Sequence, residues 1–150
     1  MVKCLNNKLS RHAVREKAVQ TLFQLIEPQA DITTESALSF AMSAGNDPED
    51  GYEGRIDPYL REIAEGVIAQ QETLDQQISQ YLTDWTIARI AKIDLTILRI
   101  AFYEILFVDN ERVPNTVAVN EAIELSKSFS DDKSRNFISG VLAKVLDKHA

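Results

Sequence analysis

The sequence carries few residues whose types and spacing could support catalysis. It contains one cysteine, Cys4, and two histidines far apart in the chain, His12 and His149, so we expect neither an internal disulfide nor a zinc cluster. It shows no phosphate-binding loop, dinucleotide glycine motif, nucleophile elbow or zinc-binding histidine pair. Glu121 and Glu124 lie one helical turn apart, a spacing common on solvated helices, and we interpret them as surface residues. The sequence therefore predicts no enzyme, no cofactor and no metal site.

Basic residues gather at the amino end, although the chain as a whole has a formal net charge of -7. Residues 1–20 hold five basic residues and one acid, whereas residues 27–80 hold twelve acids and two basic residues. A screened potential decays over roughly 8 Å at physiological salt, so a local basic surface can attract an anion that the whole molecule repels. The candidates for phosphate contacts in this segment are Lys8, Arg11 and Arg15.

Two of these residues belong to a predicted helix over residues 10–26, which Ser10 caps and Pro28 stops. Arg11 and Arg15 continue the apolar stripe of this helix toward its amino end. This pattern predicts that the first two turns overhang the core and present guanidinium groups at its rim. The alternative is a frayed, solvated terminus.

A second candidate site lies on the last predicted helix. At 100 degrees per residue, Lys133, Lys144 and Lys148 project close to Phe137, and Gly140 adjoins them. Aromatic faces stack on unpaired bases while lysines hold the backbone, which is a common way to bind single-stranded RNA. We therefore regard Lys133, Phe137 and Lys144 as candidate RNA contacts. The alternative is that Phe137 packs at the edge of the core.

The spacing of apolar residues predicts an all-α fold with about seven helices, because no segment shows the sustained alternation of a strand. The stretch over residues 87–108 is apolar nearly all round, which indicates a buried central helix that Asp94 caps internally. Residues 46–54 have the composition of an acidic loop. The other predicted helices begin at the caps Thr33 or Thr34 and Asp57 with Pro58, at a Thr73–Gln76 capping box, and at residues 116 and 133.

The length of 150 residues fits one domain. No apolar run reaches the roughly 20 uninterrupted residues of a membrane span, because charged residues break the stretch over residues 87–108. Residues 1–9 lack the apolar core of a signal peptide. We expect a cytoplasmic protein without membrane attachment.

Two sets of residues together form a pattern typical of a known family. The first set lies in the amino-terminal helix: Arg11, Arg15, Glu16, Ala18 and Leu22. The second lies in the carboxy-terminal half: Arg89, Asp94, residues 97–101, Tyr103, Glu104, Val113, Pro114, residues 120–125, Lys127, Phe129, Ser134, Phe137, Ile138 and residues 140–142. On these residues the carboxy-terminal half closely resembles the NusB family of bacterial transcription antitermination factors, and the amino-terminal helix resembles it more loosely.

This resemblance implies one NusB-like helical domain over residues 1–150, made of two packed helical subdomains over about 1–83 and 84–150. Members of the family lack catalytic activity. They join the ribosomal protein NusE to bind the boxA element of nascent, single-stranded RNA, within an antitermination complex with RNA polymerase that supports ribosomal RNA transcription.

By the same resemblance, Arg11 and Arg15 match the arginine-rich, RNA-contacting start of the family, and Phe137 matches its carboxy-terminal aromatic residue. Asp94 matches an acidic position at the NusE-binding surface. Another interpretation stays open, in which the chain is a helical protein–protein adaptor without direct RNA binding and its basic rim is an ordinary solvated surface.

Overall fold

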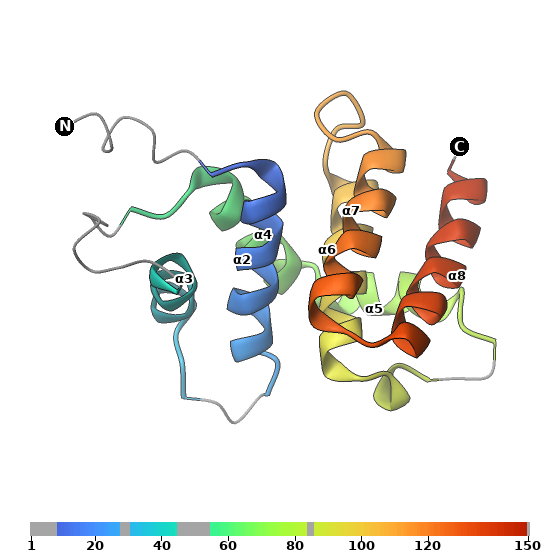
Figure 1. Ribbon diagram of the computed structural model, residues 1–150, viewed down its shortest axis with the longest axis horizontal. Coiled ribbons are helices and arrows are strands. Elements are labelled where there is room, and N and C mark those ends of the chain that lie inside the picture. The colour runs from blue at the N-terminus through green and yellow to red at the C-terminus, as the bar shows by residue number, and fades with distance from the viewer. Residues whose placement is uncertain (1–8, 28–30, 45–54, 84–85, 150) are drawn as a thin grey trace. The chain divides into compact units, whose positions relative to one another are not determined.

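The computed structural model describes residues 9–27, 31–44, 55–83 and 86–149. Within these ranges the chain forms seven α-helices, one short 3-10 helix and no strand, which confirms the predicted all-helical fold (Figure 1). Lys8 and the predicted acidic loop over residues 46–54 lie outside the described residues. The helices are α2 (Arg11–Gln24), α3 (Thr34–Ser43), α4 (Pro58–Ala69), α5 (Gln71–Ser79), η2 (Ile87–Arg89), α6 (Lys92–Phe107), α7 (Asn115–Phe129) and α8 (Asp132–Lys148).

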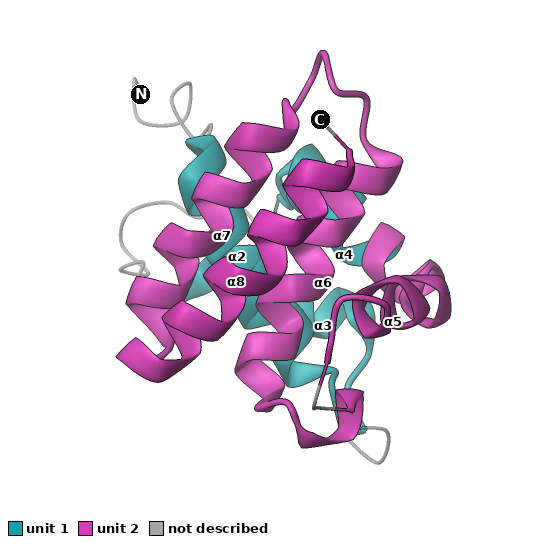
Figure 2. Ribbon diagram, turned by 90° about the vertical axis from the view of Figure 1, so that its right-hand side faces the viewer, with its two compact units in different colours: residues 1–65 teal, residues 66–150 magenta. Residues whose placement is uncertain are grey.

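The chain divides into two compact units, residues 1–65 and residues 66–150 (Figure 2). The division falls inside α4, between Glu65 and Gly66, whereas the sequence placed a subdomain boundary near residue 83. Most of α4 therefore belongs to the first unit, and its last turn belongs to the second.

In the first unit, α2 packs against α3, and both helices begin at side-chain caps. The Ser10 hydroxyl accepts a hydrogen bond from the Ala13 N–H at 3.1 Å, and the Thr33 hydroxyl accepts one from the Ser36 N–H at 3.1 Å. These bonds satisfy amide groups that lack a partner within their own helix. The predicted caps are confirmed, although α2 ends at Gln24, two residues before the predicted end.

Two polar side chains of α2 bind backbone carbonyls of α3. The Lys17 ammonium donates to the carbonyls of Ala41 and Ala44 at 2.9 and 3.1 Å, where a cation is favoured by the partial negative charge of the helix end. Partial burial lowers the pKa of Lys17 below its ordinary value. The Gln24 amide donates to the Ala37 carbonyl at 3.0 Å. These contacts fix the position of α2 along α3.

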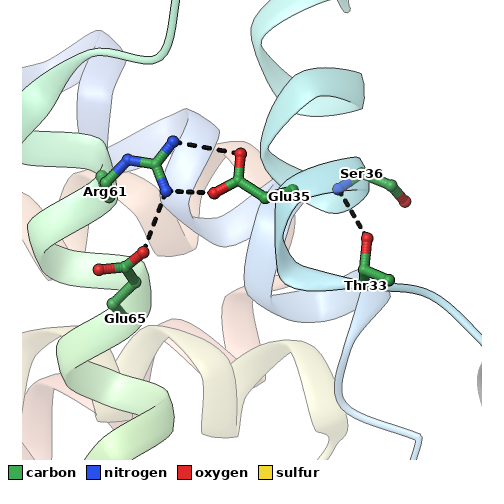
Figure 3. Close-up of polar contacts among 5 residues, drawn as sticks. All are labelled: Thr33, Glu35, Ser36, Arg61 and Glu65. Carbon is green, nitrogen blue, oxygen red and sulfur yellow. Dashed lines mark hydrogen bonds and ion pairs between the residues drawn. The ribbon is translucent and has the colours of Figure 1, made fainter.

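Arg61 links α4 to α3 on the surface of the first unit (Figure 3). Its guanidinium donates to both carboxylate oxygens of Glu35 and, at 3.0 Å, to Glu65 one turn further along α4. The hydrogen bond from Arg61 lowers the pKa of Glu35. Exposed ion pairs stabilise proteins only slightly, so the main consequence is that two nearby acids offset the charge of Arg61. The helix begins at Pro58 and is capped as predicted by Asp57, whose carboxylate accepts from the Tyr59 N–H at 2.8 Å.

The second unit is built around α6, which packs against α5, α7 and α8. Every residue from 94 to 104 is buried, which confirms the predicted central helix. The helix is shorter than predicted, because η2 precedes it and α6 begins only at Lys92. The prediction that Asp94 caps a helix is wrong: Ala91 is the capping residue, and Asp94 lies within the first turn of α6.

A partly buried ion pair joins α5 to α6. Arg99, 8% exposed, donates from Nε and Nη2 to the two carboxylate oxygens of Asp75 at 2.8 and 2.9 Å. The paired geometry compensates for removing the guanidinium from water. The predicted capping box at Thr73 is wrong, because α5 begins at Gln71 directly after α4. Thr73 already lies in the first turn of α5, so it cannot be the capping residue that precedes the helix.

Within the second unit, Gly66 in the last turn of α4 permits a close approach to the ring of Tyr103 on α6. A Cβ atom at position 66 would lie 2.2 Å from Tyr103 Cζ, far inside van der Waals contact. The ring is 9% exposed and stacks on Phe107, with 5.6 Å between the ring centroids. The ring therefore has little room to move away from a larger side chain.

We predict that Gly66→Ala lowers the free energy of unfolding by about 1 to 3 kcal/mol, the usual cost of overpacking a filled site. Urea unfolding followed by circular dichroism measures the change. Gly140→Ala is the matched control: a Cβ there meets nothing within 4 Å, so the same substitution inside α8 should raise stability by roughly 0.5 to 1 kcal/mol. A neutral or stabilising effect at position 66 would contradict the packing argument.

Candidate functional site

At the amino end of α2, Arg11 is exposed and lies over the ring of Tyr59, with 4.0 Å between its guanidinium carbon and the ring centroid. Tyr59 itself is 4% exposed, in the first turn of α4. A guanidinium at this distance is attracted to the face of an aromatic ring. The contact therefore holds a positive charge at a defined place on the surface of the first unit.

The expectation that Arg15 presents its guanidinium at the rim of the core is wrong, because this residue is only 2% exposed. It lies on the face of α2 that also buries Val14, Ala18 and Val19. Positions three and four residues apart share a helix face, so position 15 points inward together with 18 and 19. Only Arg11 of the two predicted arginine contacts is exposed.

On α8 the predicted row of Lys133, Phe137, Lys144 and Lys148 follows one side of the helix. We call its first part, together with the adjoining Gly140, the α8 stripe: Lys133, Phe137, Gly140 and Lys144. Both lysines and Gly140 are exposed, and Phe137 is partly buried. The open space beside Gly140 leaves the middle of the stripe accessible. The opposite interpretation, with Phe137 at the edge of the core, is compatible with its partial burial. The residues predicted to face the core are buried as expected: Ile138, Val141, Leu142 and Val145.

Other cations of α8 contact neighbouring groups of the second unit. Arg135 forms an ion pair with Asp132 one turn earlier, and the ammonium of Lys148 lies 5.8 Å from the centroid of the Tyr81 ring. The amino end of the helix is capped by Asp131, whose carboxylate accepts from the Ser134 N–H at 2.9 Å. This hydrogen bond holds the pKa of Asp131 below its ordinary value. The α8 stripe thus begins at a firmly capped helix end.

Asp94, predicted as a partner contact, is 4% exposed. Its Oδ1 accepts a hydrogen bond from the Ser130 hydroxyl at 2.5 Å. Ser130 directly follows α7, so the bond ties the first turn of α6 to the turn between α7 and α8. Little of the Asp94 side chain reaches the surface, and its contact with a partner stays a prediction.

Sequence reasoning missed two residues that support these groups. Tyr59 follows the Asp57–Pro58 helix start, and nothing in its spacing from position 11 indicated a contact. Ser130 lies in a polar turn, where its type suggests only local hydrogen bonds. Both contacts join residues more than thirty positions apart, which a helical projection of one segment does not detect.

Among the described residues no three His, Cys, Asp or Glu side chains lie close enough to hold a metal ion. In the same ranges, no helix combines the length and the apolar character needed to cross a membrane. The fold and the surface therefore define an all-helical protein of two compact units whose distinctive exposed groups are cations beside aromatic rings.

Comparison with known proteins identifies the family. The model of the NusB family matches residues 12–147 of this chain. The transcription antitermination protein NusB of Levilactobacillus brevis is 52% identical over 141 residues, which cover 93% of this chain and 94% of the relative. That of Bacillus subtilis is 38% identical and covers 91% and 95%. The chain belongs to the NusB family.

Solved structures agree with the fold. A structure of NusB from T. maritima superimposes with a TM-score of 0.77 at 28% identity, covering 95% of this chain and 94% of that one. A chain from a complex of the antitermination factors NusB and NusE with dsRNA gives a TM-score of 0.74 at 17% identity, covering 92% and 96%. At that identity the second likeness concerns the fold alone.

Proposed function

We propose that this chain is a non-catalytic, cytoplasmic transcription antitermination factor that pairs with ribosomal protein NusE and binds the boxA element of nascent RNA. In the antitermination complex with RNA polymerase it supports transcription of ribosomal RNA. The observation that carries the proposal is membership of the NusB family over residues 12–147, with relatives that are named transcription antitermination proteins.

The α8 stripe supports direct RNA binding. Phe137 offers an aromatic face for an unpaired base, and Lys133 and Lys144 lie on the same side of the helix to hold phosphates. Gly140 between them lets a nucleotide approach the helix closely. In the first unit Arg11 supplies a further exposed cation. Lys8 and Arg15 remain part of the proposal. Lys8 lies outside the described residues. Because Arg15 is buried, Arg11 is the arginine to test.

The charge of the chain supports a need for a partner. An acidic protein with short basic surfaces gains few phosphate contacts of its own, and most of the strength of RNA binding comes from such contacts. We infer that its own RNA affinity is modest and that NusE supplies further contacts. The Asp94 region is the proposed place for NusE.

Fluorescence anisotropy with a labelled boxA RNA, measured with and without saturating NusE, tests the proposed function. A scrambled RNA of equal length is the control. The proposal requires tighter binding of boxA than of the scrambled RNA, and a gain in affinity on adding NusE. A helical adaptor without direct RNA binding would bind NusE but would show no difference in affinity between boxA and the scrambled RNA.

We predict that Arg11→Gln weakens RNA binding. The slope of log affinity against log salt concentration should become shallower by about 0.7, the contribution of one phosphate contact on a single strand. Arg11→Lys keeps the charge and should keep the slope. The matched control is Arg61→Gln, because Glu35 and Glu65 already offset that charge. A slope in Arg11→Gln equal to that of the unmodified protein would refute the contact.

We predict that Phe137→Ala costs RNA affinity by roughly 1 to 3 kcal/mol through lost stacking. Phe107→Ala is the matched control, since Phe107 is 42% exposed and lies outside the α8 stripe. Affinity is measured by anisotropy and stability by thermal unfolding. If Phe137→Ala loses stability while its folded form binds RNA normally, Phe137 is a core residue and not an RNA contact.

We predict that Asp94→Asn weakens NusE binding about ten-fold or more, because it removes a buried charge that the partner would pair with. The asparagine keeps an oxygen that can accept from Ser130, so RNA binding without NusE should fall much less than NusE binding does. Calorimetric titration measures the affinity for NusE, and anisotropy measures the affinity for RNA without NusE. Unchanged NusE affinity would remove Asp94 from the partner surface.

A further inference from the structure

We propose that Asp94 and Ser130 form a positioning pair, whose hydrogen bond fixes the turn between α7 and α8 and thereby holds the α8 stripe in its RNA-binding arrangement. The inference rests on the proposed function in one respect, since it takes RNA as the ligand of the stripe. It gives Asp94 an internal role in RNA binding that is separate from contact with a partner.

The geometry of the pair supports a firm link. Asp94 Oδ1 and the Ser130 hydroxyl oxygen are 2.5 Å apart, and Asp94 is 4% exposed. A hydroxyl that donates to a carboxylate forms a short bond of roughly twice the strength of a neutral one. Because water has little access to this carboxylate, losing the donor would leave a buried acceptor short of a partner.

Ser130 stands where two helices meet. Its own N–H donates to the Ser126 carbonyl at 2.9 Å and closes the end of α7. The next residue, Asp131, caps α8: its side chain accepts from the Ser134 N–H at 2.9 Å and its carbonyl accepts from the Arg135 N–H at 3.0 Å. The hydrogen bond to Asp94 adds the contact that ties this two-residue turn to α6.

The turn and the α8 stripe are close in the chain. Lys133 is the second residue of α8, and Phe137 follows one turn later. Both side chains lie in the first two turns of α8, so a shift of the turn at Ser130 would displace the end of the helix that carries them. Asp94 belongs to α6, whose residues 94–104 are all buried. The pair therefore places the stripe relative to the most buried helix of the unit.

Two substitutions separate the positioning role from a partner contact. Asp94→Asn removes the charge but keeps an oxygen that accepts from Ser130, whereas Ser130→Ala removes the donor but keeps the charge of Asp94. The proposal expects Ser130→Ala to weaken RNA binding without NusE by roughly 2- to 30-fold, the range for substitutions that act on a ligand site through neighbouring structure. Asp94→Asn, which keeps an acceptor but loses the charge that strengthens the bond, should weaken RNA binding less than Ser130→Ala does. Ser130→Thr, which keeps the hydroxyl, should bind RNA like the unmodified protein.

Amide hydrogen exchange on the full chain provides a readout that does not depend on RNA. In Ser130→Ala and in Asp94→Ala the amides of Ser134 and Arg135 should exchange faster, while those in the middle of α6 should not. The double variant should resemble either single variant in exchange and in RNA affinity, because both remove the same bond. Additive effects would contradict the pairing.

Asp75→Asn is the control for general loss of stability, since it weakens the ion pair with Arg99 on the other side of α6 and leaves the turn intact. RNA affinity of its folded form should be unchanged. The proposal of a positioning pair would be overturned if amide exchange were unaltered in Ser130→Ala. It would also be overturned if Asp75→Asn lost as much RNA affinity as Ser130→Ala. If instead exchange changes as expected while Phe137→Ala and Lys133→Gln bind RNA normally, the pair stands as a structural link and the proposed RNA site on α8 fails.

Discussion

The complete burial of the central part of α6 is the constraint on which the second unit depends. A helix whose residues 94–104 are all buried must find partners for its charged side chains, because an uncompensated charge away from water is costly. Arg99 forms an ion pair with Asp75, and this pair sets the position of α5. Asp94 accepts a hydrogen bond from Ser130, and this bond sets the turn between α7 and α8. The polar residues of the core thus determine where the neighbouring helices lie.

The cations of the chain divide into those held by other groups and those presented to solvent. Lys17 binds the carbonyls at the end of α3, Arg61 is offset by two glutamates, and Arg99 is buried against Asp75. Arg11, Lys133 and Lys144 are exposed. A net charge of -7 therefore does not by itself exclude anion binding, since the location of the exposed cations decides what an anion meets.

The sequence predicted what local chemistry determines. Ser10, Thr33 and Asp57 cap helices through hydrogen bonds to residues two or three positions away, so their type and spacing were enough. The failures required knowledge of distant packing. Thr73 and Gln76 have the spacing of a capping box, but Thr73 lies inside α5. Arg15 is buried with the apolar face of α2. The approach of Gly66 to Tyr103 leaves no pattern in the sequence at all, and the roles of Arg11, Phe137 and Asp94 stay predictions.

The α8 stripe and the Asp94–Ser130 bond suggest how two ligands of one small protein can influence each other. If RNA binds the stripe as proposed, it would gain from a fixed turn, and a partner bound at Asp94 would compete for, or reinforce, the hydrogen bond that fixes this turn. The two affinities are then linked, and by thermodynamic reciprocity each ligand changes the affinity for the other by the same factor. Whether that factor is greater or less than one depends on whether the partner leaves the hydrogen bond between Asp94 Oδ1 and the Ser130 hydroxyl intact. A carboxylate has two oxygens, so a partner that bonds Oδ2 alone would preserve the turn and bind cooperatively with RNA.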